Sequence, residues 1–180
     1  MVAGIAAPLF FVSPGQINMQ LPFETAVGSA STLVSASGAL SSASPVNVST
    51  VAPGILTQDS SGTGLGLITD ALTGALITAA APIARGQIVT VYASGFGPVN
   101  PPVATGSAAL ASPLSFTANT VTAKVGGVDA KVTFAGLAPT FVALYQLNIE
   151  IPATAPTGAA VPLTTTVNGV SSNLVMVAVK

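Results

Sequence analysis

Gln16-Ile-Asn-Met-Gln-Leu-Pro22 is repeated near the other end of the chain as Gln146-Leu-Asn-Ile-Glu-Ile-Pro152. The two peptides share Gln, Asn and Pro at matching positions and lie 146 − 16 = 130 residues apart. Side chains alternate between the two faces of a β-strand, so each peptide predicts a polar row on one face and an apolar row on the other. The sequence therefore predicts that one structural unit occurs twice.

The repeat extends on both sides of this peptide. The other matching segments are residues 4–11 with 127–134 and residues 37–42 with 168–172. Residues 1–51 thus correspond to about 125–180, and nothing ahead of Met1 corresponds to residues 85–124. We therefore expect the first unit to lack the opening strands that the second unit has.

The remaining pattern is typical of short antiparallel strands. Val, Ile, Thr and Leu alternate with small polar residues in period two, and helical periodicity is absent. Turn residues such as Gly126-Gly127 and Asn168-Gly169 separate these runs at intervals of about ten residues. The sequence predicts an all-β chain of two tandem immunoglobulin-like antiparallel β-sandwich modules.

The module boundaries follow from the repeat and from the turn signals. We expect an incomplete immunoglobulin-like module at residues 1–52 and a complete one at residues 85–180. Residues 53–84 contain two short apolar runs between Gly-rich and Asp-containing turns. They are predicted to be a linker that carries an extra β-hairpin.

Composition excludes several classes of function. Charged residues make up 5% of the chain and the net charge is −1, which offers no basic surface for nucleic acid. The longest apolar run, residues 2–12, is interrupted by Gly4 and Pro8 and is too short to cross a bilayer. No basic residue precedes that run, so it does not resemble a signal peptide.

The residues that usually carry catalysis are missing or scattered. The chain has no His and no Cys, and its five acids, Glu24, Asp59, Asp70, Asp129 and Glu150, occur singly. Triads, acid–base pairs and most zinc sites need such residues in clusters. We expect no enzymatic activity, no cofactor and no metal. Two alternatives remain for Asp59 and Asp70, since an Asp in a Gly-rich loop either opens a turn or binds Ca²⁺.

The repeated polar residues also have two interpretations. Gln16, Asn18 and Pro22, and likewise Gln146, Asn148 and Pro152, could form a ligand platform on one sheet face. Alternatively, the amides bond neighbouring backbone and the Pro ends the strand. We favour the structural interpretation because both units carry the same residues. The aromatic residues are expected to pack in the core or between modules; they are Phe10, Phe11, Phe23, Phe96, Phe134, Phe141 and Tyr145.

Several longer strings resemble a known family. They are Leu9-Phe-Phe-Val-Ser-Pro-Gly-Gln-Ile-Asn18, Ala52-Pro-Gly-Ile55, Gly86-Gln-Ile-Val-Thr-Val-Tyr-Ala-Ser-Gly-Phe-Gly-Pro98, Phe134-Ala-Gly-Leu-Ala-Pro139 and Tyr145-Gln-Leu-Asn-Ile-Glu-Ile-Pro152. Across essentially the whole chain, they resemble the uncharacterised C-terminal domain of secreted Acidobacteria (Solibacter-type) proteins. That family is similar to IPT/TIG immunoglobulin-like modules. The resemblance implies a bacterial protein, an extracellular or cell-surface location and no assigned activity.

The missing opening strands suggest a structural function. A strand from another subunit, or from another β-protein, could complete the first module and link chains into a filament or surface array. Alternatively, residues 53–84 or the second module could cover the gap and leave a passive spacer. A third alternative is that the chain is cut from a longer protein. A carbohydrate- or surface-binding module, with a surface glycan as partner, also remains open.

Overall fold

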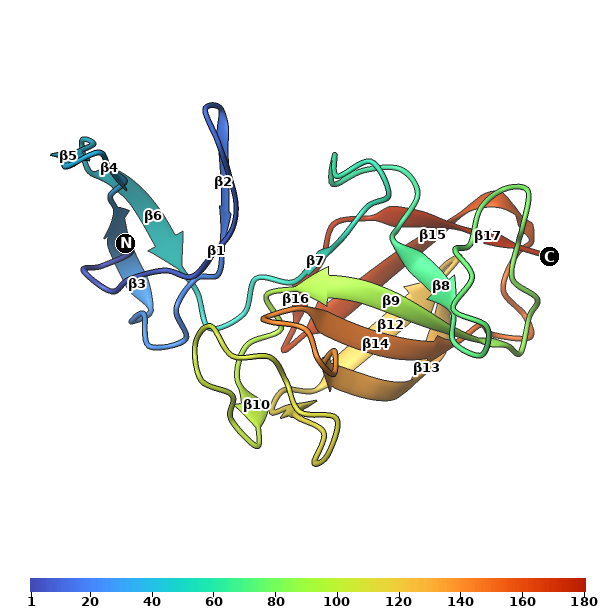
Figure 1. Cartoon of the computed structure of the whole chain (residues 1–180). Coiled ribbons are helices and arrows are strands. Elements are labelled where there is room, and N and C mark those ends of the chain that lie inside the picture. Colours follow the sequence, from blue (N-terminus) through green and yellow to red (C-terminus); the bar gives the residue numbers. More distant parts are fainter.

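The computed structural model describes all 180 residues and contains strands but no helices. Figure 1 shows two parts, which we name the N-terminal repeat (residues 1–50) and the main body (residues 51–180). The N-terminus lies in the N-terminal repeat, and the C-terminus lies at the far end of the main body. None of the chain forms a helix with the length and apolar character required to cross a membrane.

The main body is built on one antiparallel sheet. Its strands follow the order β16 (Val170–Ser171), β15 (Gly158–Val167), β12 (Val121–Val125), β13 (Val128–Leu137), β14 (Tyr145–Glu150), β9 (Ile88–Ser94) and β7 (Gly54–Ile55). Four further strands attach to this path: β8 (Ile68–Asp70) on β9, β17 (Val175–Val179) on β15, and β10 (Val99–Asn100) with β11 (Phe116–Thr117) on β13. The expected all-β, antiparallel character is confirmed.

The sheet curves into a nearly closed barrel. Isolated bridges pair Leu65 with Met176 and Ile83 with Val179, and so bring the segment around β8 against β17. The interior holds 25 buried apolar residues, which begin at Val51 and include none of residues 1–50. Closure removes most free strand edges from the main body, and this is how barrels avoid unwanted pairing.

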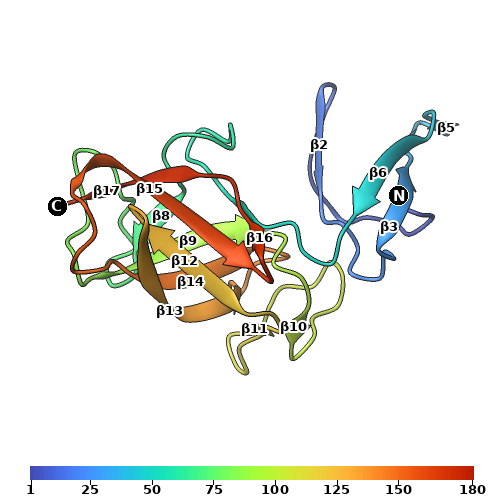
Figure 2. The ribbon, with the colours of Figure 1, turned by 180° about the vertical axis from the view of Figure 1, so that it is seen from behind.

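The N-terminal repeat consists of three separate two-stranded pairs. They are β1 (Leu9–Ser13) with β2 (Gln16–Met19), β3 (Gly28–Thr32) with β6 (Ser44–Val48), and β4 (Ser35–Ala36) with β5 (Ala39–Leu40). The hairpin of β1 and β2 stands clear of the main sheet when the molecule is seen from the front and from behind (Figure 1, Figure 2). An isolated hairpin is only marginally stable. Among the aliphatic side chains of this part only Val2 and Val48 are buried, and neither belongs to the core of the barrel.

Residues 53–84 differ from the linker that we expected. They supply β7 and β8, both of which pair with β9, and they place Ile68, Ile77 and Ile83 in the core. Hydrogen bonds and bridges from residues 64–78 go to the main body, and none reaches the N-terminal repeat. Local rescue by this hairpin is therefore wrong, because its apolar side chains are already used to fill the barrel.

Candidate functional site

The N-terminal repeat has the backbone geometry of the end of the main body. Ala36 pairs with Ala39 as Val167 pairs with Val170, around turns whose φ angles are 49° and 81° in one copy and 48° and 83° in the other. The turns Ala3-Gly4 and Gly126-Gly127 also match, with φ angles of 47° and 80° against 60° and 81°. The sequence repeat is therefore also a structural repeat.

The hairpin of β1 and β2 corresponds to the hairpin of β13 and β14. Phe11 lies opposite Asn18, as Phe134 lies opposite Asn148. Each hairpin has an irregularity at the residue just before this Phe, between Leu9 and Phe11 in one case and between Val132 and Phe134 in the other. The pairing of β14 with β9 therefore indicates which residue of an added strand would lie opposite each residue of β2.

The repeated polar residues make the same bond in both hairpins. Gln16 Nε2 donates to Asn18 Oδ1 at 2.7 Å, and Gln146 Nε2 donates to Asn148 Oδ1 at 3.0 Å. The amides thus bond each other along the strand, whereas we expected them to bond the backbone. The bond orients each Asn so that its Oδ1 can accept from a further donor.

Pro22 and Pro152 follow the ends of β2 and β14. The carbonyl of Pro22 accepts a bond from Thr25 N, and the carbonyl of Pro152 accepts one from Ala155 N, both at 3.0 Å. Each Pro therefore belongs to the turn that leads out of the hairpin. Together with the amide pairs, these bonds show that the six repeated residues adopt one local geometry at both sites.

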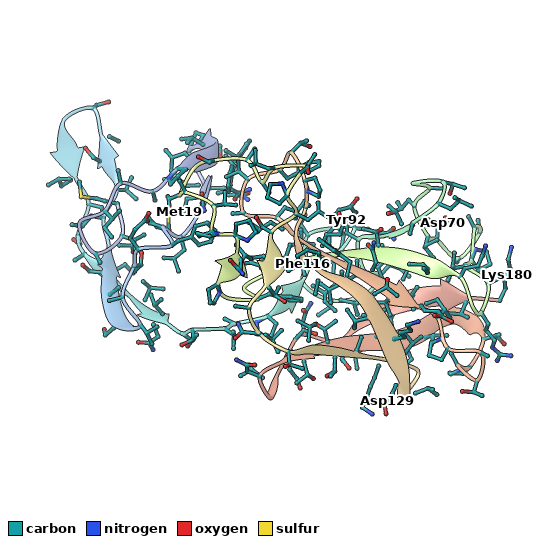
Figure 3. All side chains as sticks on the ribbon, turned by 90° about the horizontal axis from the view of Figure 1, so that it is seen from below. Met19, Asp70, Tyr92, Phe116, Asp129 and Lys180 are labelled. Carbon is teal, nitrogen blue, oxygen red and sulfur yellow. The ribbon has the colours of Figure 1, made fainter.

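The two hairpins differ in what covers them. Ile17, Met19 and Leu21 are 39%, 39% and 41% exposed, whereas the matching Leu147, Ile149 and Ile151 are completely buried. β14 has β13 on one side and β9 on the other, whereas β2 pairs only with β1. We call the unpaired side of β2 the β2 edge. Figure 3 shows Met19 on this hairpin, away from Tyr92 on β9.

The apolar surface of the N-terminal repeat is large. Twelve of the chain's 21 exposed large hydrophobic side chains lie in its first 40 residues, so exposure is concentrated where the core is absent. The aromatic residues agree with the expectation only in part. Phe96 and Tyr145 stack in the core with ring centroids 5.5 Å apart. Four others are about half exposed, namely Phe10, Phe11, Phe23 and Phe141.

One loop of the main body holds the base of the N-terminal repeat. Gly106 N donates to Gln20 Oε1 at 2.8 Å, and Thr105 Oγ1 donates to Glu24 Oε2 at 2.7 Å. The bond from Thr105 is the main reason that the pKa of Glu24 lies below its usual value. Sequence reasoning missed this contact, and no periodicity or motif marks the loop. It anchors the repeat and leaves the β1–β2 hairpin projecting.

The two Asp residues considered for Ca²⁺ open turns. Asp59 Oδ1 accepts bonds from the backbone N and hydroxyl of Ser61, and Asp70 Oδ1 accepts from the backbone N atoms of Leu72 and Thr73. These bonds lower the pKa of both carboxyl groups. No group of three or more His, Cys, Asp or Glu side chains is arranged to hold a metal ion. Lys124 forms an exposed ion pair with Asp129 across the Gly126-Gly127 turn.

The strongest candidate site is therefore the β2 edge with its apolar face. It combines an unpaired strand, exposed Ile17 and Met19, and an oriented Asn18 acceptor. Such a surface can accept another strand. A scan against protein-family models and searches of curated proteins and of solved structures found no match for this chain.

Proposed function

We propose that this chain is a non-enzymatic structural module of a bacterial extracellular or cell-surface protein. In this proposal, the N-terminal repeat is an incomplete immunoglobulin-like module that takes up a β-strand from another polypeptide chain. The main body is the complete module of the same type. Strand uptake would join chains into a filament or a surface array.

One observation carries this proposal. The N-terminal repeat has the turns, registers and side-chain bonds of the end of the main body, yet none of its residues enters the core. In the main body, β7, β8 and β9 complete the corresponding surface. The N-terminal repeat has no strands in those places, so its geometry fits half of a closed structure.

Covering the apolar face of β2 contributes favourably to strand uptake. Full burial of a large aliphatic or aromatic side chain contributes about 1.5–3 kcal/mol relative to exposure. Ile17, Met19 and Leu21, which are 39%, 39% and 41% exposed, correspond to a gain of roughly 2–4 kcal/mol before ordering costs. Main-chain hydrogen bonds along the added strand contribute further affinity. Low charge also limits repulsion between copies.

Size-exclusion chromatography with light scattering, over a wide concentration range, tests the proposal together with hydrogen exchange. We expect residues 9–21 to exchange fast in the free chain and more slowly once a strand is bound. If a second copy supplies that strand, the mass should also grow with concentration. A chain that stays monomeric at millimolar concentration, while residues 9–21 are as protected as residues 145–150, would contradict it.

A further inference from the structure

The main body shows which kind of strand fits beside the repeated hairpin. β9 lies antiparallel to β14 with Thr90 opposite Asn148, Val89 opposite Ile149 and Val91 opposite Leu147. Val89 and Val91 are fully buried, so the two β-branched residues pack on the same face as the apolar row of β14. β9 therefore serves as an internal template for a partner of β2.

One polar contact fixes the register of this pairing. Thr90 Oγ1 donates to Asn148 Oδ1 at 3.2 Å, and the same Oδ1 accepts from Gln146 Nε2. Asn18 Oδ1 already accepts from Gln16 Nε2 at 2.7 Å. It has one further lone pair to offer, and no strand stands beside it to supply the hydroxyl.

The β2 edge carries none of the features that block strand addition. Edge strands are commonly protected by charged residues, by Pro or by a bulge. β2 has no charged residue and no Pro, and the irregularity of its hairpin lies on β1. All four of its residues are exposed. A strand can therefore approach without removing any existing partner.

We propose that the β2 edge binds an antiparallel strand of a partner polypeptide with the pattern of β9. A Thr-type hydroxyl of that strand lies opposite Asn18, and β-branched residues lie opposite Ile17 and Met19. This inference rests on the proposed function, because it specifies the strand that the incomplete module takes up. The oriented Asn18 carbonyl selects one register, and the apolar face supplies the affinity.

The partner strand is not β9 of a second copy. β9 is paired on both sides, with β14 on one and with β7 and β8 on the other, and it fills the core. β2 of a second copy has the sequence Gln-Ile-Asn-Met, so it has no hydroxyl to place opposite Asn18. The experiment must therefore distinguish binding of a β9-like strand from pairing between the β2 strands of two copies.

The probe is a fluorescein-labelled peptide with the sequence of residues 86–95, Gly-Gln-Ile-Val-Thr-Val-Tyr-Ala-Ser-Gly, added to the full chain. We expect saturable binding by fluorescence anisotropy and shifted amide NMR signals at β2. Replacing Thr90 by Val in the peptide should weaken binding about 2- to 12-fold, the net effect of one hydrogen bond. With an Asn18→Ala chain, this difference between the peptides should disappear.

The matched control is Asn148→Ala, the same change in the other copy of the repeat. It should leave the preference for the Thr peptide intact, since β14 is already paired. A scrambled peptide of the same composition should not shift the β2 signals. Binding away from β2, or equal binding of the Thr and Val peptides, would overturn the inference.

The design separates this inference from the proposed function. If the chain assembles through β2 but the peptide neither binds nor competes, the inference fails and the proposed function stands. If the chain is monomeric with β2 protected from exchange, both fail. Peptide binding at β2 by an otherwise monomeric chain supports the inference and rules out self-assembly.

Discussion

Leu147 and Ile17 occupy the same position of the repeated hairpin, so replacing each by Ala compares a covered copy with an open one. Leu147 is fully buried, between Ala135 of β13 and Val91 of β9. Ile17 is 39% exposed and lies outside the core. The same kind of truncation should therefore have very different effects on the free energy of unfolding.

The expected magnitudes follow from burial. Leu147→Ala removes buried carbons and leaves a cavity inside the barrel, which should cost about 2–5 kcal/mol. Ile17→Ala changes a surface side chain and should alter the free energy of unfolding of the main body by no more than about 0.5 kcal/mol. If Leu147→Ala does not fold, Ile149→Val gives a milder loss of about 0.5–1.5 kcal/mol.

Urea unfolding followed by far-ultraviolet circular dichroism measures both variants. The chain has no Trp, so the fluorescence of its two Tyr residues supplies the second probe. The slope of free energy against urea should stay unchanged, which shows that the same surface is exposed on unfolding. If Ile17→Ala destabilised the monomer by about 2 kcal/mol or more, the hairpin would be packed in solution, and the reasoning from its exposure would be refuted.

Three further predictions concern the main body and its contact with the N-terminal repeat. Burial raises the pKa of Tyr145 from 10.0 to about 12. The contribution of Tyr145 to the unfolding free energy should therefore be constant below pH 10 and fall by about 2 kcal/mol by pH 12, and Tyr145→Phe should remove this decrease. The pKa of Glu24 is lowered by its bond from Thr105, so the contribution of this bond to stability is present above pH 4.5 and is lost on acidification. After correction for intrinsic rates, the amides of residues 20–25 should exchange faster at pH 3 than at pH 7 in the wild type. In Thr105→Val, their corrected exchange rates should be the same at both pH values. A Cβ at Gly95 would clash with the carbonyl oxygen of Ala52. Gly95→Ala should therefore lower the melting temperature by about 10 °C or more, and an unchanged melting temperature would contradict this close approach.

The local features of the fold could be predicted from the sequence. Period-two alternation identifies β14, in which Leu147 and Ile149 are buried and Asn148 faces outward beside its Gln partner. Asn168-Gly169 forms the expected hairpin turn between β15 and β16. These features depend on residues that are close in sequence, where alternation and turn preference act directly.

The remaining features depend on contacts between distant residues. β7 and β8 are two and three residues long, too short for alternation to be recognised, and they become strands only because β9 offers them an edge. The bond between Glu24 and Thr105 joins residues 81 positions apart. The candidate site could be predicted only in part. The sequence repeat predicts the polar row of β2, but only the fold shows which edge of β2 is unpaired.

Hydrogen exchange of the free, dilute chain tests the open β2 edge most directly. In one experiment, it compares the backbone amides of β2 with those of β14, which have matching residues and the same hairpin register. We expect β14 to exchange only on global unfolding, and the outward-facing amides of β2 to exchange orders of magnitude faster. Equal protection of the two strands in a chain shown to be monomeric would contradict the claim that the N-terminal repeat awaits a partner strand.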